Sequence, residues 1–136
     1  MKRTITVLLV ICVLLFSSVT FASASICDSI VPMAENYTDV DVRLDIASGE
    51  AKLTSIMYGK IGTTTKVTIH LYLQQYKDGK WIDYDDWIKS VNSVKCSLSE
   101  TVSVPKGYTY RAKASCYAYA GSKSEHVIKY SSEGKY

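Results

Sequence analysis

The chain has 136 residues and a formal net charge of +3, from 16 basic and 13 acidic side chains. A chain of this length can bury one hydrophobic core and leaves no room for a second domain. If Lys2 and Arg3 are removed with the N-terminal segment, 14 basic and 13 acidic residues remain, a net charge of +1. A nearly neutral surface gives no electrostatic footprint for nucleic acid or for an anionic membrane, so we expect neither as a partner.

Residues 1–24 have the layout of a cleavable secretory signal. A positive start precedes an apolar run over residues 5–16, and Ala22-Ser23-Ala24 offers small residues at the −3 and −1 positions. The alternative is a membrane anchor, but a spanning helix needs about 20 apolar residues and this run is shorter. We therefore expect cleavage after Ala24, a secreted, extracellular mature chain and no stable membrane insertion after cleavage.

Three cysteines remain after this cleavage, Cys27, Cys96 and Cys116. Export permits disulfides, and an odd count leaves at least one thiol that is free or pairs between chains. Cys96 and Cys116 lie in strand-like segments that can be neighbours, so they are the first candidates for a bridge, although spacing alone does not prove a pair. Cys27 is then a free thiol or the link of a disulfide-linked dimer. Ile26 disfavours its lipidation, because a lipoprotein signal needs a small residue there.

Residues 25–39 show no periodicity and are interpreted as a lead-in segment to a domain over residues 40–136. In that domain, apolar and polar residues alternate with the period of two that marks a strand with one buried face. Turn residues separate these segments. The expected strands are residues 40–46, 51–58, 66–76, a strand from Trp81 to the break at Asn92, 94–104, 108–120 and 124–130. The final six residues are polar, and we expect them to fray.

The turns and the strand spacing together predict the fold class. Asp78-Gly79 is the leading short-range hairpin signal, because both central residues of a type I′ turn need positive φ. A bulge or a small turn at Ser99-Glu100 would explain an apparent change of phase in residues 94–104. No window after the signal has helical periodicity. About seven short antiparallel strands predict an all-β, immunoglobulin-like or fibronectin-like sandwich after an N-terminal signal-peptide helix.

A turn glycine, Gly107, precedes a tyrosine that enters a strand, Tyr110. Immunoglobulin-type sandwiches place their tyrosine corner here, with the hydroxyl bonded back to the backbone between two strands. We therefore expect a structural role for Tyr110. Ala112 stands where antibody domains have their second cysteine, so their disulfide between the two sheets is not expected.

Several short runs of the mature chain carry a resemblance. They are Lys66-Val67-Thr68-Ile69, Leu73-Gln74, Gly79, Trp81, Trp87, Gly107, Tyr110-Arg111 and Gly121-Ser122-Lys123-Ser124-Glu125. Together they resemble a family of small exported proteins from Gram-positive, largely gut-dwelling bacteria, classed as a domain of unknown function. The two tryptophans six positions apart and the Gly-Ser-Lys-Ser-Glu run are the most specific marks. The resemblance implies a secreted, single-domain β protein and brings no catalytic residue with it.

Catalytic motifs do not stand out in this sequence. The two histidines are His70 and His126, and no G-x-S-x-G elbow accompanies them to present a nucleophile beside its base. We interpret both as residues of a sheet surface. The chain is therefore not expected to be an enzyme, and no cofactor is expected.

The acidic residues of the hairpin allow two further readings. Asp83 and Asp85 would lie about 7 Å apart along a strand, within the range of glycosidase carboxylates, but a small domain beside a tight hairpin is not expected to supply the deep cleft. Together with Asp78 and Asp86 they offer oxygen ligands for calcium. The alternative, which we favour, is a solvated acidic edge that discourages strand pairing, so no metal site is expected.

Both tryptophans of the chain lie in residues 77–89. In a strand without a bulge, one face carries Trp81, Asp83, Asp85 and Trp87. Two indoles that flank two carboxylates could stack a saccharide and accept hydrogen bonds from its hydroxyls. A bulge near Asp85-Asp86 would instead turn at least one tryptophan inward, as sandwich cores favour.

We therefore predict a secreted, non-enzymatic β-sandwich module that binds a glycan, the cell wall or a surface protein. The step from fold to function is analogy only. Two alternatives stay open: a secreted antimicrobial or toxin-like effector, and a structural or dimerising surface element.

Overall fold

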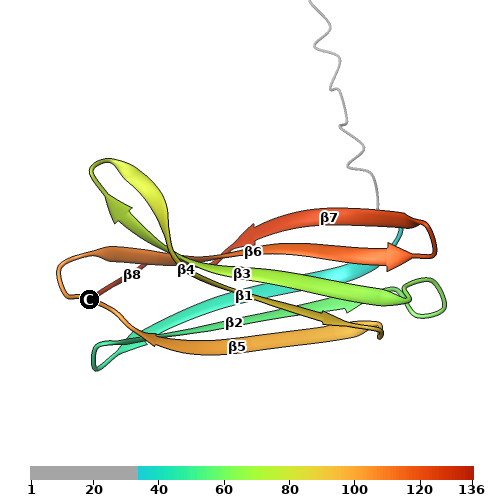
Figure 1. Cartoon of the computed structure of the whole chain (residues 1–136), viewed down its shortest axis with the longest axis horizontal. Coiled ribbons are helices and arrows are strands. Elements are labelled where there is room, and N and C mark those ends of the chain that lie inside the picture. The colour runs from blue at the N-terminus through green and yellow to red at the C-terminus, as the bar shows by residue number, and fades with distance from the viewer. Residues whose placement is uncertain (1–33) are drawn as a thin grey trace, which may run out of the picture. The chain divides into compact units, whose positions relative to one another are not determined.

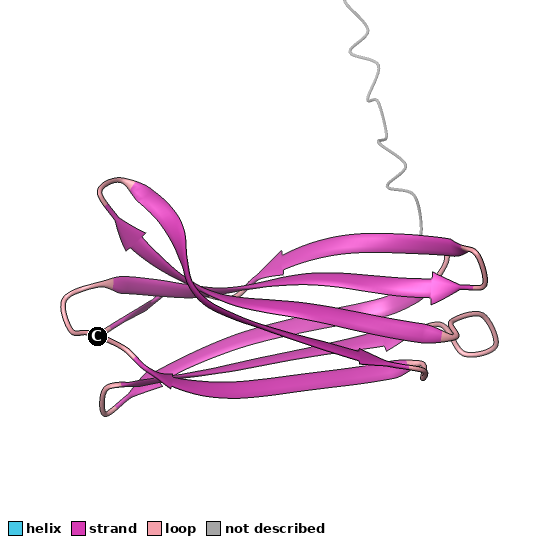
Figure 2. Cartoon of the chain, in the orientation of Figure 1, coloured by secondary structure: helices cyan, strands magenta, loops and turns pink. Residues whose placement is uncertain are grey.

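The computed structural model describes residues 34–136. The expected signal peptide and Cys27 lie outside the described residues. All regular elements of residues 34–136 are β-strands (Figure 2). They are β1 (Tyr37–Ala47), β2 (Glu50–Gly59), β3 (Lys66–Lys77), β4 (Lys80–Val91), β5 (Lys95–Ser103), β6 (Thr109–Ala120), β7 (Lys123–Tyr130) and the short β8 (Gly134–Lys135). This part of the chain has no helix of the length and apolarity that crossing a membrane requires.

The strands form two antiparallel sheets (Figure 1). One sheet has the order β1-β2-β5 and the other has the order β4-β3-β6-β7. The short β8 pairs with the start of β6, beyond the part of β6 that pairs with β7. The prediction of an all-β fold with about seven antiparallel strands in two sheets is confirmed.

The core lies between the sheets and follows the alternation in the sequence. In β3, the odd-numbered residues Val67, Ile69, Leu71 and Leu73 are fully buried. The inward residues of β6 are small (Ala112, Ala114, Cys116 and Ala118) and are also fully buried. Small side chains on β6 let β1 and β2 of the facing sheet approach it, and both strands contact β6.

Two tight turns have the backbone that their residues favour. Ser48 and Gly49 have φ angles of 51° and 86°, and Asp78 and Gly79 have φ angles of 51° and 78°. Positive φ at both central residues defines the type I′ turn, whose twist matches that of the flanking strands. The hairpin predicted at Asp78-Gly79 is therefore present between β3 and β4.

Strand β5 runs without interruption, so the bulge predicted at Ser99-Glu100 is wrong. Thr54 pairs with Ser99 and Leu53 with Glu100 in an unbroken register. The even-numbered residues face inward along the whole strand, and Glu100 is a half-buried polar residue among them. An inward charge on an edge strand is one way to discourage pairing with another chain.

The two ends of the described chain are tied to the sandwich. The Glu125 carboxylate accepts hydrogen bonds from the backbone N–H groups of Glu35 (2.8 Å) and Asn36 (2.7 Å), and β1 begins at Tyr37, within the expected lead-in segment.

The expected fraying of the last six residues is wrong, because β8 pairs with Thr109 and Tyr110. Gly134 packs closely on β1, since a Cβ there would lie 2.9 Å from Ile46 Cδ1 and would push the end of that side chain aside.

Tyr110 is fully buried and links three segments. Its hydroxyl donates to the Pro105 carbonyl oxygen (2.7 Å) in the connection between β5 and β6, and accepts from Gln75 Nε2 of β3 (3.0 Å). This is the backward bond that a tyrosine corner makes. Burial raises the pKa of Tyr110 above its ordinary value of 10.0, while the bond from Gln75 acts in the opposite direction.

Tyr110→Phe should lower the free energy of unfolding by about 1–3 kcal/mol, because it leaves the buried Gln75 amide without its acceptor. Urea titration of the mature chain measures this loss. Tyr108→Phe is the matched control, since Tyr108 is the neighbouring half-buried tyrosine and its ring contacts Tyr110 edge to face. Equal stabilities of the two variants would contradict the role of the Tyr110 hydroxyl.

Candidate binding face on the outer sheet

A β-bulge interrupts the pairing of β4 with β3. Gln74 pairs with Asp83, whereas the preceding residue Leu73 pairs with Asp85, so Tyr84 has no partner of its own. An extra residue in one strand reverses the faces on which the following side chains lie. The tip of this hairpin bends away from the remainder of the sheet (Figure 1).

The bulge separates the four residues that were expected to share one face. Trp81 pairs with Tyr76 on the outer face of the sheet, whereas Trp87 pairs with Leu71 on the inner face. Trp87 is half-buried and packs against the core. Asp83 lies on the side of Trp81 and Asp85 on the side of Trp87. The prediction that Trp81, Asp83, Asp85 and Trp87 share one face is therefore wrong. The alternative, a bulge that turns one tryptophan inward, is the arrangement that β4 adopts.

The carboxylates of β4 are engaged in local hydrogen bonds. Asp83 accepts from Gln74 Nε2 (2.6 Å), and Asp86 lies 2.7 Å from His70 Nε2. Asp85 accepts from the backbone N–H of Asp86 (2.9 Å). No group of three His, Cys, Asp or Glu side chains within residues 34–136 is placed to hold a metal ion. Because Asp83 and Asp85 lie on opposite faces, they do not form a carboxylate pair around one bond either.

Aromatic rings cover the outer face of the β4-β3-β6-β7 sheet. Tyr76 and Trp81 have ring centroids 5.1 Å apart. His70 stacks on Tyr72 at 4.1 Å, and His126 stacks on Tyr117 at 4.3 Å. Each contact joins neighbouring strands or neighbouring outward positions, so the rings form three aromatic clusters on this face, which together are called the platform.

Three cationic side chains, Arg111, Lys113 and Lys66, lie over aromatic rings of this outer face. Arg111 Cζ is 4.2 Å from the centroid of Trp81 and 4.3 Å from that of Tyr130. Lys113 Nζ lies 4.5 Å from the Tyr72 ring and Lys66 Nζ 4.8 Å from the Tyr119 ring. Each distance is within the range of a cation–π interaction. The ion pairs formed within the described chain are Arg43–Asp41 and His70–Asp86, so none of the three cations has a carboxylate partner there.

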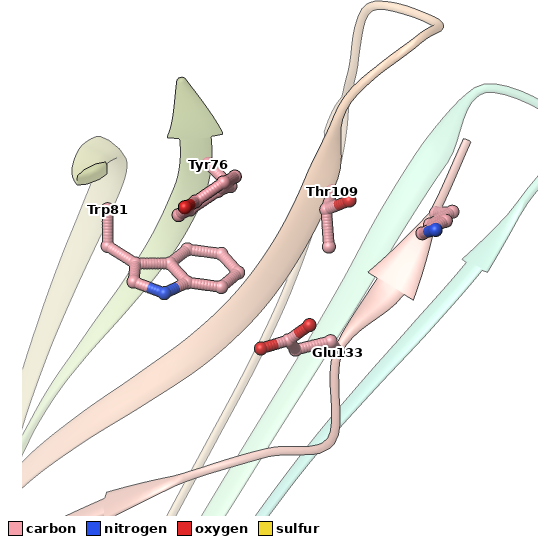
Figure 3. A pocket seen from close by; sticks show the side chains of 5 residues that line it. Tyr76, Trp81, Thr109 and Glu133 are labelled. Carbon is pink, nitrogen blue, oxygen red and sulfur yellow. The ribbon is translucent and has the colours of Figure 1, made fainter. Parts of the chain in front are cut away.

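A hollow of about 440 Å³ opens at the end of this platform. It is lined by Tyr76, Trp81, Thr109, Glu133 and Lys135. Figure 3 shows the two rings on one side of the hollow and Thr109 with Glu133 on the other. The docked C-terminal segment supplies Glu133 and Lys135. Neither residue was expected at a site, because the last six residues were expected to fray.

Both histidines have specific partners, which a description as ordinary surface residues did not anticipate. The ring of His70 lies between Asp86 and the Tyr72 hydroxyl, 2.7 Å from each. Burial, followed by the charges of Asp83 and Asp86, raises the pKa of Tyr72. His126 Nε2 lies 2.7 Å from the Ser115 hydroxyl. Within the described residues no carboxylate orients the other nitrogen of His126, as a catalytic triad requires.

Cys96 and Cys116 are buried free thiols, so the expected bridge between them is wrong. They come from facing sheets, since Cys96 pairs with Met57 and Cys116 with Ile69. Burial raises the pKa of Cys116 to about 11. The neighbouring Ser55 hydroxyl lowers this pKa in part, and Cys96 raises it further.

No protein family and no curated protein matches this chain. Among solved structures, the chain is similar to the solution structure of CsgH from R. palustris, with a TM-score of 0.41 and 8% identity over 66% of this chain and 88% of that one. It is also similar to the crystal structure of a protein from Archaeoglobus fulgidus, with a TM-score of 0.38 and 8% identity over 72% of this chain and 94% of that one. Similarities at this level carry no inference about function.

The buried Cys116 thiol predicts a loss of stability at alkaline pH. Its pKa rises from 9.0 to about 11 on folding, so the unfolded chain releases the proton first. Through this group the free energy of unfolding should then fall by about 2 kcal/mol as the pH rises from 9 to 11, and by about 3 kcal/mol in total well above pH 11, with little contribution below pH 8.

Denaturation under reducing conditions between pH 8 and pH 11 measures this loss, with Cys116→Ala as the comparison. The tyrosines titrate in both proteins, so the difference between the two curves reports Cys116. The variant should lose less stability over this range, and parallel curves would contradict the prediction.

Proposed function

We propose that the mature chain is an exported, non-enzymatic module that binds glycans, with a saccharide seated in the hollow beside Trp81. The observation that carries this proposal is the composition of the hollow. Two aromatic rings, Tyr76 and Trp81, lie opposite Thr109 and Glu133 (Figure 3), and Lys135 also lines the hollow. The apolar face of a sugar ring suits the aromatic side, and its hydroxyls suit the donors and acceptors across from it.

The size of the hollow agrees with a small ligand. Ligand pockets typically measure about 300–1,000 Å³ and combine apolar surface with a few placed polar groups. At about 440 Å³, the hollow suits one or two sugar units of a longer chain. A site that is open along a sheet face also allows the remaining polymer to extend over the platform.

An immunoglobulin-like or fibronectin-like sandwich is the finer fold assignment that we propose. The orders β1-β2-β5 and β4-β3-β6-β7 support it, as does the bond from Tyr110 to Pro105. Such sandwiches serve many unrelated functions, so the fold alone does not name the ligand.

The proposal also includes that the chain is exported and that it is not an enzyme. Export rests on the signal-like layout of residues 1–24 and on the resemblance to small exported proteins of Gram-positive bacteria. It would bring the hollow into contact with cell-wall or host surface glycans. The non-enzymatic part is supported by the cross-strand bonds of Asp83 to Gln74 and of Asp86 to His70, which engage both carboxylates within the sheet.

Trp81→Ala should weaken saccharide binding by about tenfold or more, because it removes the larger ring of the hollow while the core-packed Trp87 stays in place. A tenfold loss corresponds to about 1.4 kcal/mol. A glycan array and a peptidoglycan pull-down with the mature chain identify the ligand, and calorimetric titration of the variant gives its affinity.

Tyr58→Ala is the control for this experiment, because Tyr58 is an exposed aromatic residue of the other sheet. It should bind as the unchanged protein does. A blank array together with a blank pull-down would sink the glycan proposal, as would equal losses in the two variants.

A further inference from the structure

Arg111 is held in place on the outer face by three neighbours. Its guanidinium contacts the rings of Trp81 and Tyr130, and its Nε donates to Gln74 Oε1 at 2.8 Å. Gln74 is buried and its amide nitrogen donates to Asp83, so the acceptor of Arg111 is itself oriented. The guanidinium therefore loses little freedom when it binds a further group.

The terminal amino groups of Arg111 remain available. Within residues 34–136 the bond from Nε is the side-chain hydrogen bond that Arg111 makes, and no carboxylate lies at ion-pair distance. Guanidinium presents its remaining N–H groups as a planar fork that matches a carboxylate or a sulfate. Arg111 is half-buried, and because no carboxylate of the described chain reaches it at ion-pair distance, an anionic ligand can supply the closest opposite charge.

Lys113 extends this cationic site. It lies two residues further along β6 on the same face, about 7 Å from Arg111 along the strand, with its Nζ over Tyr72. The acidic groups that face the pair are Asp83 and Asp86 on β4 and Glu133 in the hollow. The oxygens of Asp83 and Asp86 are bonded to Gln74 and His70, and within residues 34–136 neither carboxylate forms an ion pair with Arg111 or Lys113.

We infer that the outer face recognises acidic saccharides, with Arg111 and Lys113 binding an oxyanion group of the sugar chain. This inference rests on the proposed glycan site, because Arg111 touches Trp81 at the border of the hollow. A sugar in the hollow places its substituents, or those of the next unit, beside the guanidinium. The shared chemistry is a carboxylate of a uronic acid or a sulfate ester, and these two sources are separated by experiment.

Three polysaccharides of different charge test the inference with the mature protein. Polygalacturonate carries carboxylates, dextran sulfate carries sulfate esters and dextran is neutral. At least one charged polymer should bind about tenfold more tightly than dextran. Equal binding of charged and neutral polymers would overturn the inference and leave the glycan site standing. A blank with all three polymers overturns it too, and the glycan array then decides separately on the proposed function.

Variants of Arg111 and Lys113 test whether these residues cause the preference for charged polymers. Arg111→Lys keeps the charge but loses the planar fork, so affinity for the preferred charged polymer should fall about tenfold. Arg43→Lys, on the facing sheet, is the matched control and should not change it. If Arg111→Lys fails to fold, Lys113→Gln replaces it and should selectively weaken binding of the charged polymer. Equal affinities of the folded site variant and the control would refute the assignment.

Discussion

The unpaired residue Tyr84 in β4 is the constraint on which the arrangement of the outer sheet depends. Side chains alternate along a strand, so one extra residue exchanges the two faces for everything beyond it. Without it, Trp81 and Trp87 would lie on the same face. With it, Trp87 packs against the core, and Trp81 stands beside Tyr76 and Arg111 on the outer face. One bulge therefore gives the two tryptophans of the chain different surroundings.

The side chains on the outer face of the β4-β3-β6-β7 sheet contact one another through ring stacking and cation–π interactions. Rings from neighbouring strands stack, and Arg111, Lys113 and Lys66 lie over them. The aromatic surface thus gains polar contacts without being covered by another layer. The C-terminal segment completes the arrangement, because β8 pairs with β6 and brings Glu133 and Lys135 to the hollow beside Trp81. The hollow therefore depends on the hairpin, on β6 and on the chain end together.

Features of the fold that depend on local pattern could be predicted from the sequence. The alternation in β3 and β6, the turn at Asp78-Gly79 and the role of Tyr110 each follow from residues close together in the chain. The phase of β4 could not be predicted, because the polar residues Asp83, Asp85 and Asp86 are equally acceptable on either side of an edge strand. Only the pairing with Leu73 and Gln74 decides it.

The other incorrect predictions, on the cysteines, the chain end and the histidines, also depend on contacts that the local sequence pattern does not determine. Cys96 and Cys116 lie on facing sheets and are near enough for Cys96 to raise the pKa of Cys116, yet they are not bonded. Strand patterns do not determine the distance between two inward thiols. The docking of the C-terminal residues depends on the pairing of β8 with β6 and on backbone bonds between Tyr136 and residues 107–108, which join segments more than twenty residues apart. Asp86, a partner of His70, and Ser115, the partner of His126, likewise lie on neighbouring strands at positions set by register.

The division of the two tryptophans can be measured directly by nuclear Overhauser contacts of the two indole rings in solution. The structure predicts contacts from the Trp87 indole to the methyl groups of Leu71, its inward partner on β3, and from the Trp81 indole to Tyr76 and Arg111. Contacts from the Trp81 indole to core methyl groups, or from the Trp87 indole to the outer-face rings, would contradict the bulge at Tyr84 and the binding face that depends on it.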